Sequence, residues 1–199
     1  MFSAYDYTQA PPPQFELIPH GTIADISLHI RPGGVGEDKL LKRSSNGGCE
    51  MLDVEFTVVD GAYAKRKFWQ NFVMAGTTDG HAKAAEISRS MLKAILDCVH
   101  GLKPDDVSAQ ARAARTVELK DFEGRIFIGK IGIEKGGPKN DGSGEFWDDK
   151  NILVAVITRD KKEWHSIEQP PPFNGGSKAA TSSASPETVP PISRPGWAS

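Results

Sequence analysis

Hydrophobic and polar residues alternate in several segments of this chain, which is the pattern of half-buried β-strands. The first such segment is residues 22–30, and its apolar side carries Ala24, Ile26, Leu28 and Ile30. The second is residues 49–61, and its apolar side carries Leu52, Val54, Phe56 and Val58. Asp60 and Gly61 form a turn signal at the end of the second segment. Residues 64–76 are therefore predicted to return as a third strand.

The period changes to helical spacing within residues 77–106. The apolar positions at this spacing are Ala84, Ile87, Met91, Leu92, Ile95, Leu96 and Val99. Thr78 or Asp79 can cap the start of the helix, Gly101 suits its C-terminal end, and Pro104 prevents it from continuing. The sequence thus predicts one long amphipathic helix after three strands.

The rest of the folded part is predicted to be mainly β. Residues 106–119 form either a short second helix or an irregular link, and 125–136 and 151–164 are the last two strands. The order β-β-β-α-β-β matches a five-stranded OB-fold-like barrel with its helix between strands three and four. In that fold, the face of strands two and three and the loops one-two and four-five bind oligonucleotides or oligosaccharides. The corresponding loops, 31–48 and 136–150, are long, glycine-rich and contain lysines.

Both ends of the chain have compositions that disfavour packing. Residues 1–20 contain three consecutive prolines, which favour an extended polyproline conformation. Residues 168–199 are rich in Pro, Ser, Gly and Ala and offer little apolar surface to bury. We therefore expect a flexible arm at 1–20, one folded domain at 21–167 and a disordered tail at 168–199.

Overall charge and targeting features exclude several classes. The net charge is −2, and the charged residues outside 21–167 are Asp6, Glu16, Glu168, Lys178, Glu187 and Arg194. The folded part is therefore about neutral, so any basic site must be local. Neither a signal-peptide pattern nor an apolar run of the roughly 18 residues needed to cross a membrane is present. Cys49 and Cys98 make no metal or disulfide framework, so we expect a cytoplasmic protein with reduced thiols and no membrane partner.

Single-stranded nucleic acid requires cations that follow the phosphates and flat side chains that stack on the bases. The basic candidates are Lys42, Arg43, Lys65, Arg66, Lys67, Lys135 and Lys139, and the aromatic candidates are Tyr63, Trp69, Phe127, Phe146 and Trp147. In the third strand Phe68, Gln70 and Phe72 share one side, so Trp69 and Asn71 face outward if the Phe pair is core. Strand aromatics are more often core residues, and adjacent cations are more often solvated, so an ordinary strand remains the alternative. The aromatic pair 146–147 lies in a polar loop, where contact with a ligand or a partner is at least as favoured as core packing.

Catalysis finds little support in the sequence. The five histidines, His20, His29, His81, His100 and His165, show no ligand spacing. Pro104 and Asp105, together with residues 148–150 (Asp-Asp-Lys), are similar to a nuclease pattern, but the second half lies in a loop where that pattern needs a strand. We therefore expect no enzyme, no cofactor and no metal site, with a nuclease as the least favoured class.

A family resemblance rests on the segments DGAYAKRKFWQN and AAEISRSMLKAI. The matching positions are Gly61, Arg66, Trp69 and Asn71 on the third strand, and Ile87, Arg89, Leu92 and Ile95 on the helix. Over about residues 17–165 the chain resembles a phage and prophage family long catalogued as a domain of unknown function. That family is similar to OB-fold single-stranded-DNA-binding proteins, and its genes commonly accompany phage recombination and replication functions. Many such proteins end in an acidic tail closed by an aromatic residue, whereas the tail here is neutral around Trp197.

Together these observations predict a non-enzymatic, phage-type protein that coats single-stranded DNA without sequence specificity in replication or recombination. The alternative is an OB-like adaptor that binds a recombination or replication protein. The oligomeric state stays open, with a homodimer as one alternative.

Overall fold

The computed structural model describes residues 16–45, 47–139 and 142–170, and the predictions for 1–15 and 171–199 lie outside them. The described chain is mainly β, with one long helix. Its strands are β1 Ile23–Arg31, β2 Leu41–Arg43, β3 Cys49–Val58, β4 Lys67–Gly76, β5 Ile126–Glu134 and β6 Lys150–Val156. Its α-helices are α1 Asp79–Val99 and α2 Ala109–Arg115, and short 3-10 turns span Gly61–Tyr63 and Leu119–Phe122. The predicted order is confirmed, the short strand β2 is added to it, and α2 shows that the helical alternative holds for part of residues 106–119.

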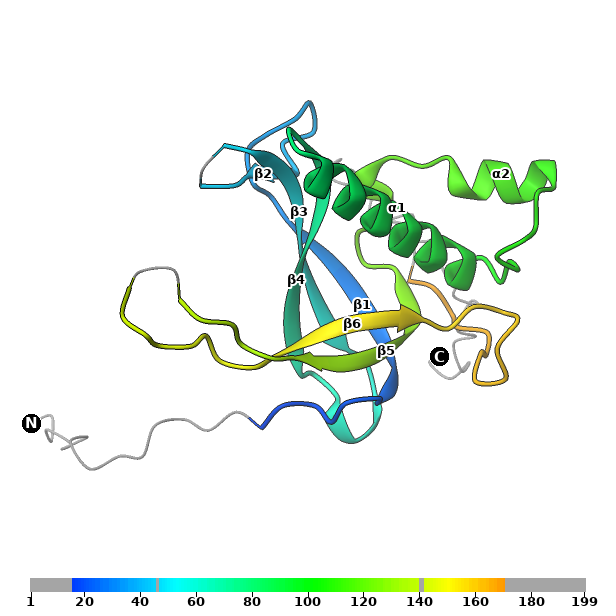
Figure 1. The fold of residues 1–199 in the computed structure, drawn as a ribbon. Coiled ribbons are helices and arrows are strands. Elements are labelled where there is room, and N and C mark those ends of the chain that lie inside the picture. The colour runs from blue at the N-terminus through cyan, green and yellow to red at the C-terminus, as the bar shows by residue number, and fades with distance from the viewer. Residues whose placement is uncertain (1–15, 46, 140–141, 171–199) are drawn as a thin grey trace, which may run out of the picture.

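The six strands form one antiparallel sheet (Figure 1). Strand β3 pairs with β4 along one edge and with β1 and β2 along the other, and β5 joins β1 to β6. A closed barrel is not formed, because the ladder pairings of the described residues leave β4 and β6 as the two ends of the path. The two strands nevertheless approach each other, and the Gln70 side chain on β4 accepts a hydrogen bond from the backbone N of Leu153 on β6 at 2.9 Å.

The hydrophobic core lies between the inward side of the sheet and helix α1. The alternation predicted for β1 and β3 is confirmed, since the inward residues of both strands are buried. The ring of Phe56 lies at the centre and contacts the rings of Phe68, Phe72 and Phe127, with centroids 5.1, 6.2 and 5.9 Å away. Side chains alternate along β4, and Phe68 and Phe72 point into the core. Trp69 and Asn71 therefore point to the outer side of the sheet.

Helix α1 begins and ends where the sequence predicts. The Thr78 hydroxyl accepts a hydrogen bond from the backbone N of His81, and Gly101 adopts a left-handed conformation with φ of 61° just beyond the helix. The buried side of the helix carries Ala85, Ser88, Leu92, Ile95 and Leu96. The prediction that Ile87 belongs to this side is wrong, because Ile87 is 60% exposed. It precedes Ser88 by one residue, which turns its side chain by about 100° around the helix.

A buried carboxylate fixes the second helix to the first. Asp97 on α1 is fully buried and forms ion pairs with Lys93 Nζ at 2.7 Å and Arg115 Nε at 2.6 Å. Arg115 also donates to the backbone carbonyl oxygens of Lys103 and Asp106. Arg115, the last residue of α2, therefore holds this helix in place. Its guanidinium pairs with the carboxylate on α1 and also donates to two carbonyls of the segment between the helices.

The packed part of the chain starts before residue 21. Ile18 is a core residue, and its backbone N and O are both bound by the side-chain amide of Asn151 on β6, at 2.9 and 2.8 Å. Gly21 N also donates to the carbonyl of Ile131. Within the described residues, no helix combines the length and apolar character needed to cross a membrane.

Candidate functional site

The basic run that precedes β4 is held in a defined turn. Gly61 follows the end of β3 with φ of 77°, and Lys65 has φ of 68°, a left-handed conformation that is uncommon for a residue other than glycine. Lys65 N donates to the carbonyl of Val58, and Val58 N donates to the carbonyl of Arg66. The turn predicted at Asp60–Gly61 is thus confirmed, and it places the basic run at one end of the sheet.

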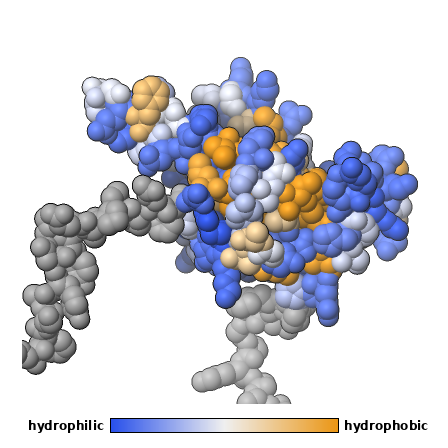
Figure 2. Space-filling model, turned by 90° about the horizontal axis from the view of Figure 1, so that it is seen from below, coloured by the Kyte–Doolittle hydropathy of each residue, from blue (hydrophilic) through white to orange (hydrophobic). Residues whose placement is uncertain are grey.

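The gap between β4 and β6 contains a pocket of about 560 Å³, which we call the β4–β6 pocket. Its lining comes from three segments, and the residues are Glu16, Leu17, Lys65, Arg66, Lys67, Phe68, Trp69, Asp149, Lys150 and Asn151. Figure 2 views the molecule from below and shows hydrophobic residues reaching the surface among hydrophilic ones. The open sheet therefore brings four cations and an exposed indole to one hollow.

The cations of this pocket are not equally available. Lys67 Nζ lies 2.6 Å from a carboxylate oxygen of Glu55, and Lys150 Nζ lies 2.8 Å from one of Glu134. Arg66 donates to the backbone carbonyl of Glu16, and neither Arg66 nor Lys65 forms an ion pair with any carboxylate in the described part of the chain. Lys65 and Arg66 are therefore the two cations of the pocket without an ion pair among the described residues, and the carboxylates of Glu16 and Asp149 line the same pocket.

Trp69 faces outward, as the alternation predicts, and is 46% exposed. Its indole Nε1 donates to the second carboxylate oxygen of Glu55 at 3.1 Å, which fixes the ring on the outer side of β4. The hydrogen bond from Lys67 holds the pKa of Glu55 below its usual value, although partial burial acts in the opposite direction. Asn71 is exposed two residues further along the same side. Glu55 was missed as a site residue, although its alternation with Val54 and Phe56 placed it on the polar side of the second strand.

The basic residues of β2 lie at the other end of the sheet. Lys42 pairs with Met51, which pairs with Val73, and Val73 is six residues from Lys67. At about 3.3 Å per residue this separates the two basic groups by about 20 Å. Lys42 and Arg31 both contact Asp53, at 2.8 and 3.5 Å, so cations and carboxylates alternate along this outer face. Arg43 lies 2.8 Å from Glu50 in the same way.

Two aromatic candidates do not belong to any exposed site. Phe127 is fully buried against Phe56 and cannot stack on a base, so its assignment as a binding residue is wrong. Tyr63 is half-buried and packs against the core. Residues 126–128 are all apolar, so alternation in that strand gave no signal for which side faces the core.

The loop between β5 and β6 extends away from the sheet (Figure 1), and we call its described residues, 135–139 and 142–149, the aromatic arm. Lys139 N donates to the carbonyl of Glu145, and Trp147 N donates to that of Gly137, so the arm continues the hairpin. Gly136 is required at its base, because an added Cβ would lie 1.5 Å from the Trp147 carbonyl oxygen. Phe146 is 66% exposed and Trp147 64% exposed.

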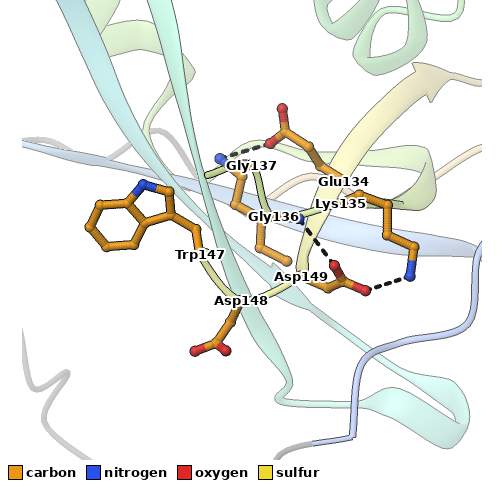
Figure 3. A pocket seen from close by; sticks show the side chains of 8 residues that line it. Glu134, Lys135, Gly136, Gly137, Trp147, Asp148 and Asp149 are labelled. Atoms are coloured by element: carbon orange, nitrogen blue, oxygen red, sulfur yellow. Dashed lines mark hydrogen bonds and ion pairs between the residues drawn. The ribbon is translucent and has the colours of Figure 1, made fainter. Parts of the chain in front are cut away.

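The charges of the aromatic arm largely neutralise one another. Lys135 Nζ lies 2.6 Å from Asp149, whose pKa this hydrogen bond lowers, and Asp149 also accepts from Gly136 N at 3.0 Å (Figure 3). Lys139 Nζ lies 2.5 Å from Glu145 and 5.4 Å from the ring centre of Trp147. These two lysines were predicted to contact phosphates, but each forms an ion pair with a carboxylate of the arm.

The two halves of the nuclease-like pattern are not brought together. Asp105 lines a polar hollow with Lys103 and Arg159, whereas residues 148–150 line another hollow at the base of the arm. Among the described residues, no group of three or more His, Cys, Asp and Glu side chains is placed to hold a metal ion.

Comparison with models of known protein families, with curated proteins and with solved structures found no match.

Proposed function

We propose that this chain binds single-stranded nucleic acid, and single-stranded DNA in particular, along the outer side of β4 and in the β4–β6 pocket. The observation that carries the proposal is the meeting of Lys65 and Arg66, which lack carboxylate partners in the described chain, with the exposed indole of Trp69. Cations that follow phosphates and an aromatic ring that stacks on bases are the two requirements of single-strand binding.

The strand order supports an OB-like interpretation of the fold. The path β4-β3-β1-β5-β6, with β4 approaching β6 and the long helix between β4 and β5, follows the order of a five-stranded OB barrel whose last seam is held by side chains. In such a fold the β3–β4 face and the loops after β1 and β5 form the binding side. Trp69 lies on that face, and the aromatic arm is one of those loops.

The geometry also limits the proposed interaction. About 20 Å separates the basic run before β4 from the basic residues of β2, so the bound segment is near the low end of the roughly 4–16 nucleotides typical of an OB fold. Glu55 and Asp53 lie on the same face and repel phosphates, which favours binding through bases and weak overall affinity. On the motif residues of β4 and α1, we further propose a phage-type role in DNA replication or recombination, in the cytoplasm.

The test compares two double variants in a single-strand binding titration over a series of salt concentrations. Lys65→Ala/Arg66→Ala should weaken binding and reduce the slope of log K against log salt by about 1.4, because each phosphate contact on a single strand contributes about 0.7. Lys161→Ala/Lys162→Ala, which removes two cations from the segment after β6, should leave the slope unchanged. Equal effects of the two variants would reject this site.

A protein-binding adaptor remains the second candidate, and the aromatic arm is the observation that favours it. The arm displays two aromatic side chains while its lysines are neutralised internally, which suits a protein surface better than a phosphate backbone.

A further inference from the structure

The exposed indole of Trp69 lies beside a carboxylate that can still accept hydrogen bonds. Glu55 on β3 is the cross-strand partner of Trp69, and the indole Nε1 donates to its Oε2 at 3.1 Å. Lys67 Nζ donates to its Oε1 at 2.6 Å and holds the pKa of Glu55 below its usual value, so the carboxylate is ionised. An ionised carboxylate has about four lone-pair sites and no donor, so these contacts leave about half of its accepting capacity. The Glu55 side chain is 17% exposed, and a group that meets it from solvent must be a donor.

The neighbours of Glu55 do not use this remaining capacity. His29 on β1 is opposite Glu55, but its Nδ1 lies 2.5 Å from Glu123. Asp53, two residues away on β3, is paired with cations of its own. Among the described residues, Lys67 is the one cation within ion-pair distance of Glu55.

The cations at the edge of β4 set the direction in which a bound nucleotide crosses the sheet. Lys65 and Arg66 line the β4–β6 pocket, on the side of β4 that faces away from β3. A phosphate held there keeps its sugar near this edge, so a base stacked on Trp69 points across β4 toward β3. The Watson–Crick edge is the part of a base farthest from the sugar, and neighbouring strands are only about 4.8 Å apart. This edge therefore comes to the carboxylate of Glu55.

The bases differ in the donors that they present along this edge. Cytosine and adenine each carry an exocyclic amino group, and guanine carries one next to its N1–H. Uracil and thymine instead present two carbonyl oxygens on either side of one N3–H. A carboxylate accepts from an amino group, as in the pairing of glutamate with the N4 amino group of cytosine, but it repels a carbonyl oxygen. A carboxylate next to a stacking ring is therefore suited to the amino-bearing bases.

We propose that Glu55 makes the single-strand site selective for bases with an exocyclic amino group, which donates to the carboxylate while the base stacks on Trp69. The inference rests on the proposed function, because it needs a nucleotide on the outer side of β4. The selectivity concerns the type of base at one position of the bound strand. Glu55 then has two opposite effects, since it repels every phosphate nearby and attracts only some bases.

Two pairs of oligonucleotides that differ in amino groups test this selectivity. The first pair is oligo-deoxycytidylate and oligo-deoxyuridylate of about ten nucleotides, within the range that an OB fold covers. The second pair alternates thymine with guanine or with hypoxanthine, which is guanine without its amino group. Fluorescence anisotropy at low salt and neutral pH measures the affinity of the full-length protein for each strand. The cytosine strand should bind at least about threefold more tightly than the uracil strand, and the guanine strand more tightly than the hypoxanthine strand.

Glu55→Gln separates recognition by the carboxylate from differences in stacking. Its amide can donate to a carbonyl as well as accept from an amino group, so both affinity ratios should fall close to one. Its affinity for the uracil strand should rise. Glu163→Gln is the matched control, because it removes an exposed carboxylate from the segment after β6, and it should leave both ratios unchanged. Circular dichroism verifies that both variants are folded.

The outcomes distinguish this inference from the proposed function. Equal affinity of the unmodified protein for the two members of each pair would overturn the selectivity and leave single-strand binding intact. A preference that persists in Glu55→Gln would overturn the role of Glu55, because stacking or another residue would then account for it. Absence of binding to all four strands at low salt would reject both proposals.

Discussion

Glu55 is the residue whose replacement tests the binding face most sharply. Its carboxylate lies on the outer side of the sheet, accepts from both Lys67 and Trp69, and stays ionised because its pKa is lowered by the Lys67 hydrogen bond. Glu55→Gln removes one negative charge but keeps an oxygen that can accept from the Trp69 indole. The fold should survive, since an exposed ion pair contributes only about 0–1 kcal/mol.

The expected effect is tighter binding of single strands. A phosphate at about 6 Å from the carboxylate is repelled by about 0.7 kcal/mol even at the dielectric constant of water, which corresponds to about threefold in affinity. Lys67, freed from Glu55, adds about one phosphate contact and makes the salt slope more negative by about 0.7.

Fluorescence anisotropy of a labelled oligo-thymidylate at several salt concentrations measures both quantities. Glu163→Gln serves as the control, because it removes an exposed carboxylate that pairs with Lys162 on the segment after β6. The control should leave the affinity and the slope as they are. Unchanged or weaker binding by Glu55→Gln would refute the assignment of phosphates to this face.

Three further predictions follow from the structure. Trp69→Ala should lose about 1–3 kcal/mol of single-strand affinity with little change in thermal midpoint, as fluorescence quenching and melting curves can show; unfolding instead would make Trp69 a structural residue. Arg115→Ala should destabilise the fold by about 3–5 kcal/mol in urea unfolding, because it leaves buried Asp97 undercompensated, whereas Lys93→Ala should cost less than about 1 kcal/mol; similar losses would contradict the network. The hydrogen bond to Asp25 raises the pKa of His165, so this pair stabilises the fold below about pH 6.5 and the contribution disappears as pH rises through the folded-state pKa. NMR titration should show that Asp25→Asn lowers the midpoint of His165, and an unchanged midpoint would exclude the contact.

Local patterns predicted much of the fold because they follow from steric and burial rules. Alternation located β1, β3 and β4, and it placed Trp69 outward because Phe68 and Phe72 are core residues. The caps of α1 were also readable, since Thr78 and Gly101 have specific backbone roles.

Features that depend on contacts between distant parts of the chain could not be predicted from the sequence. Phe127 lies in a strand that is apolar on both sides, so its burial could not be separated from exposure by periodicity. The Asn151 amide that binds the backbone of Ile18 joins residues far apart in the chain. The open seam between β4 and β6 likewise depends on the register of paired strands rather than on any local pattern.

The sequence predicted which types of residue form the candidate site. It did not predict which of their charges are neutralised by carboxylates. The basic run before β4 was visible, yet the carboxylates that neutralise Lys42 and Lys67 come from β3, which pairing alone brings into contact. The number of free cations is therefore smaller than the sequence indicated, and the expected strength of phosphate binding falls accordingly.

The most direct test of the central claim is the affinity of the full-length chain for single-stranded DNA as a function of salt. Lys65 and Arg66 form no ion pair among the described residues, and Lys67 and Lys150 each pair with one carboxylate. These cations predict about two to four phosphate contacts and a slope of log K against log salt of about −1.4 to −2.8. Measurable binding at low salt with a slope in this range is the expected result. Absence of binding to single strands at low salt would contradict the account.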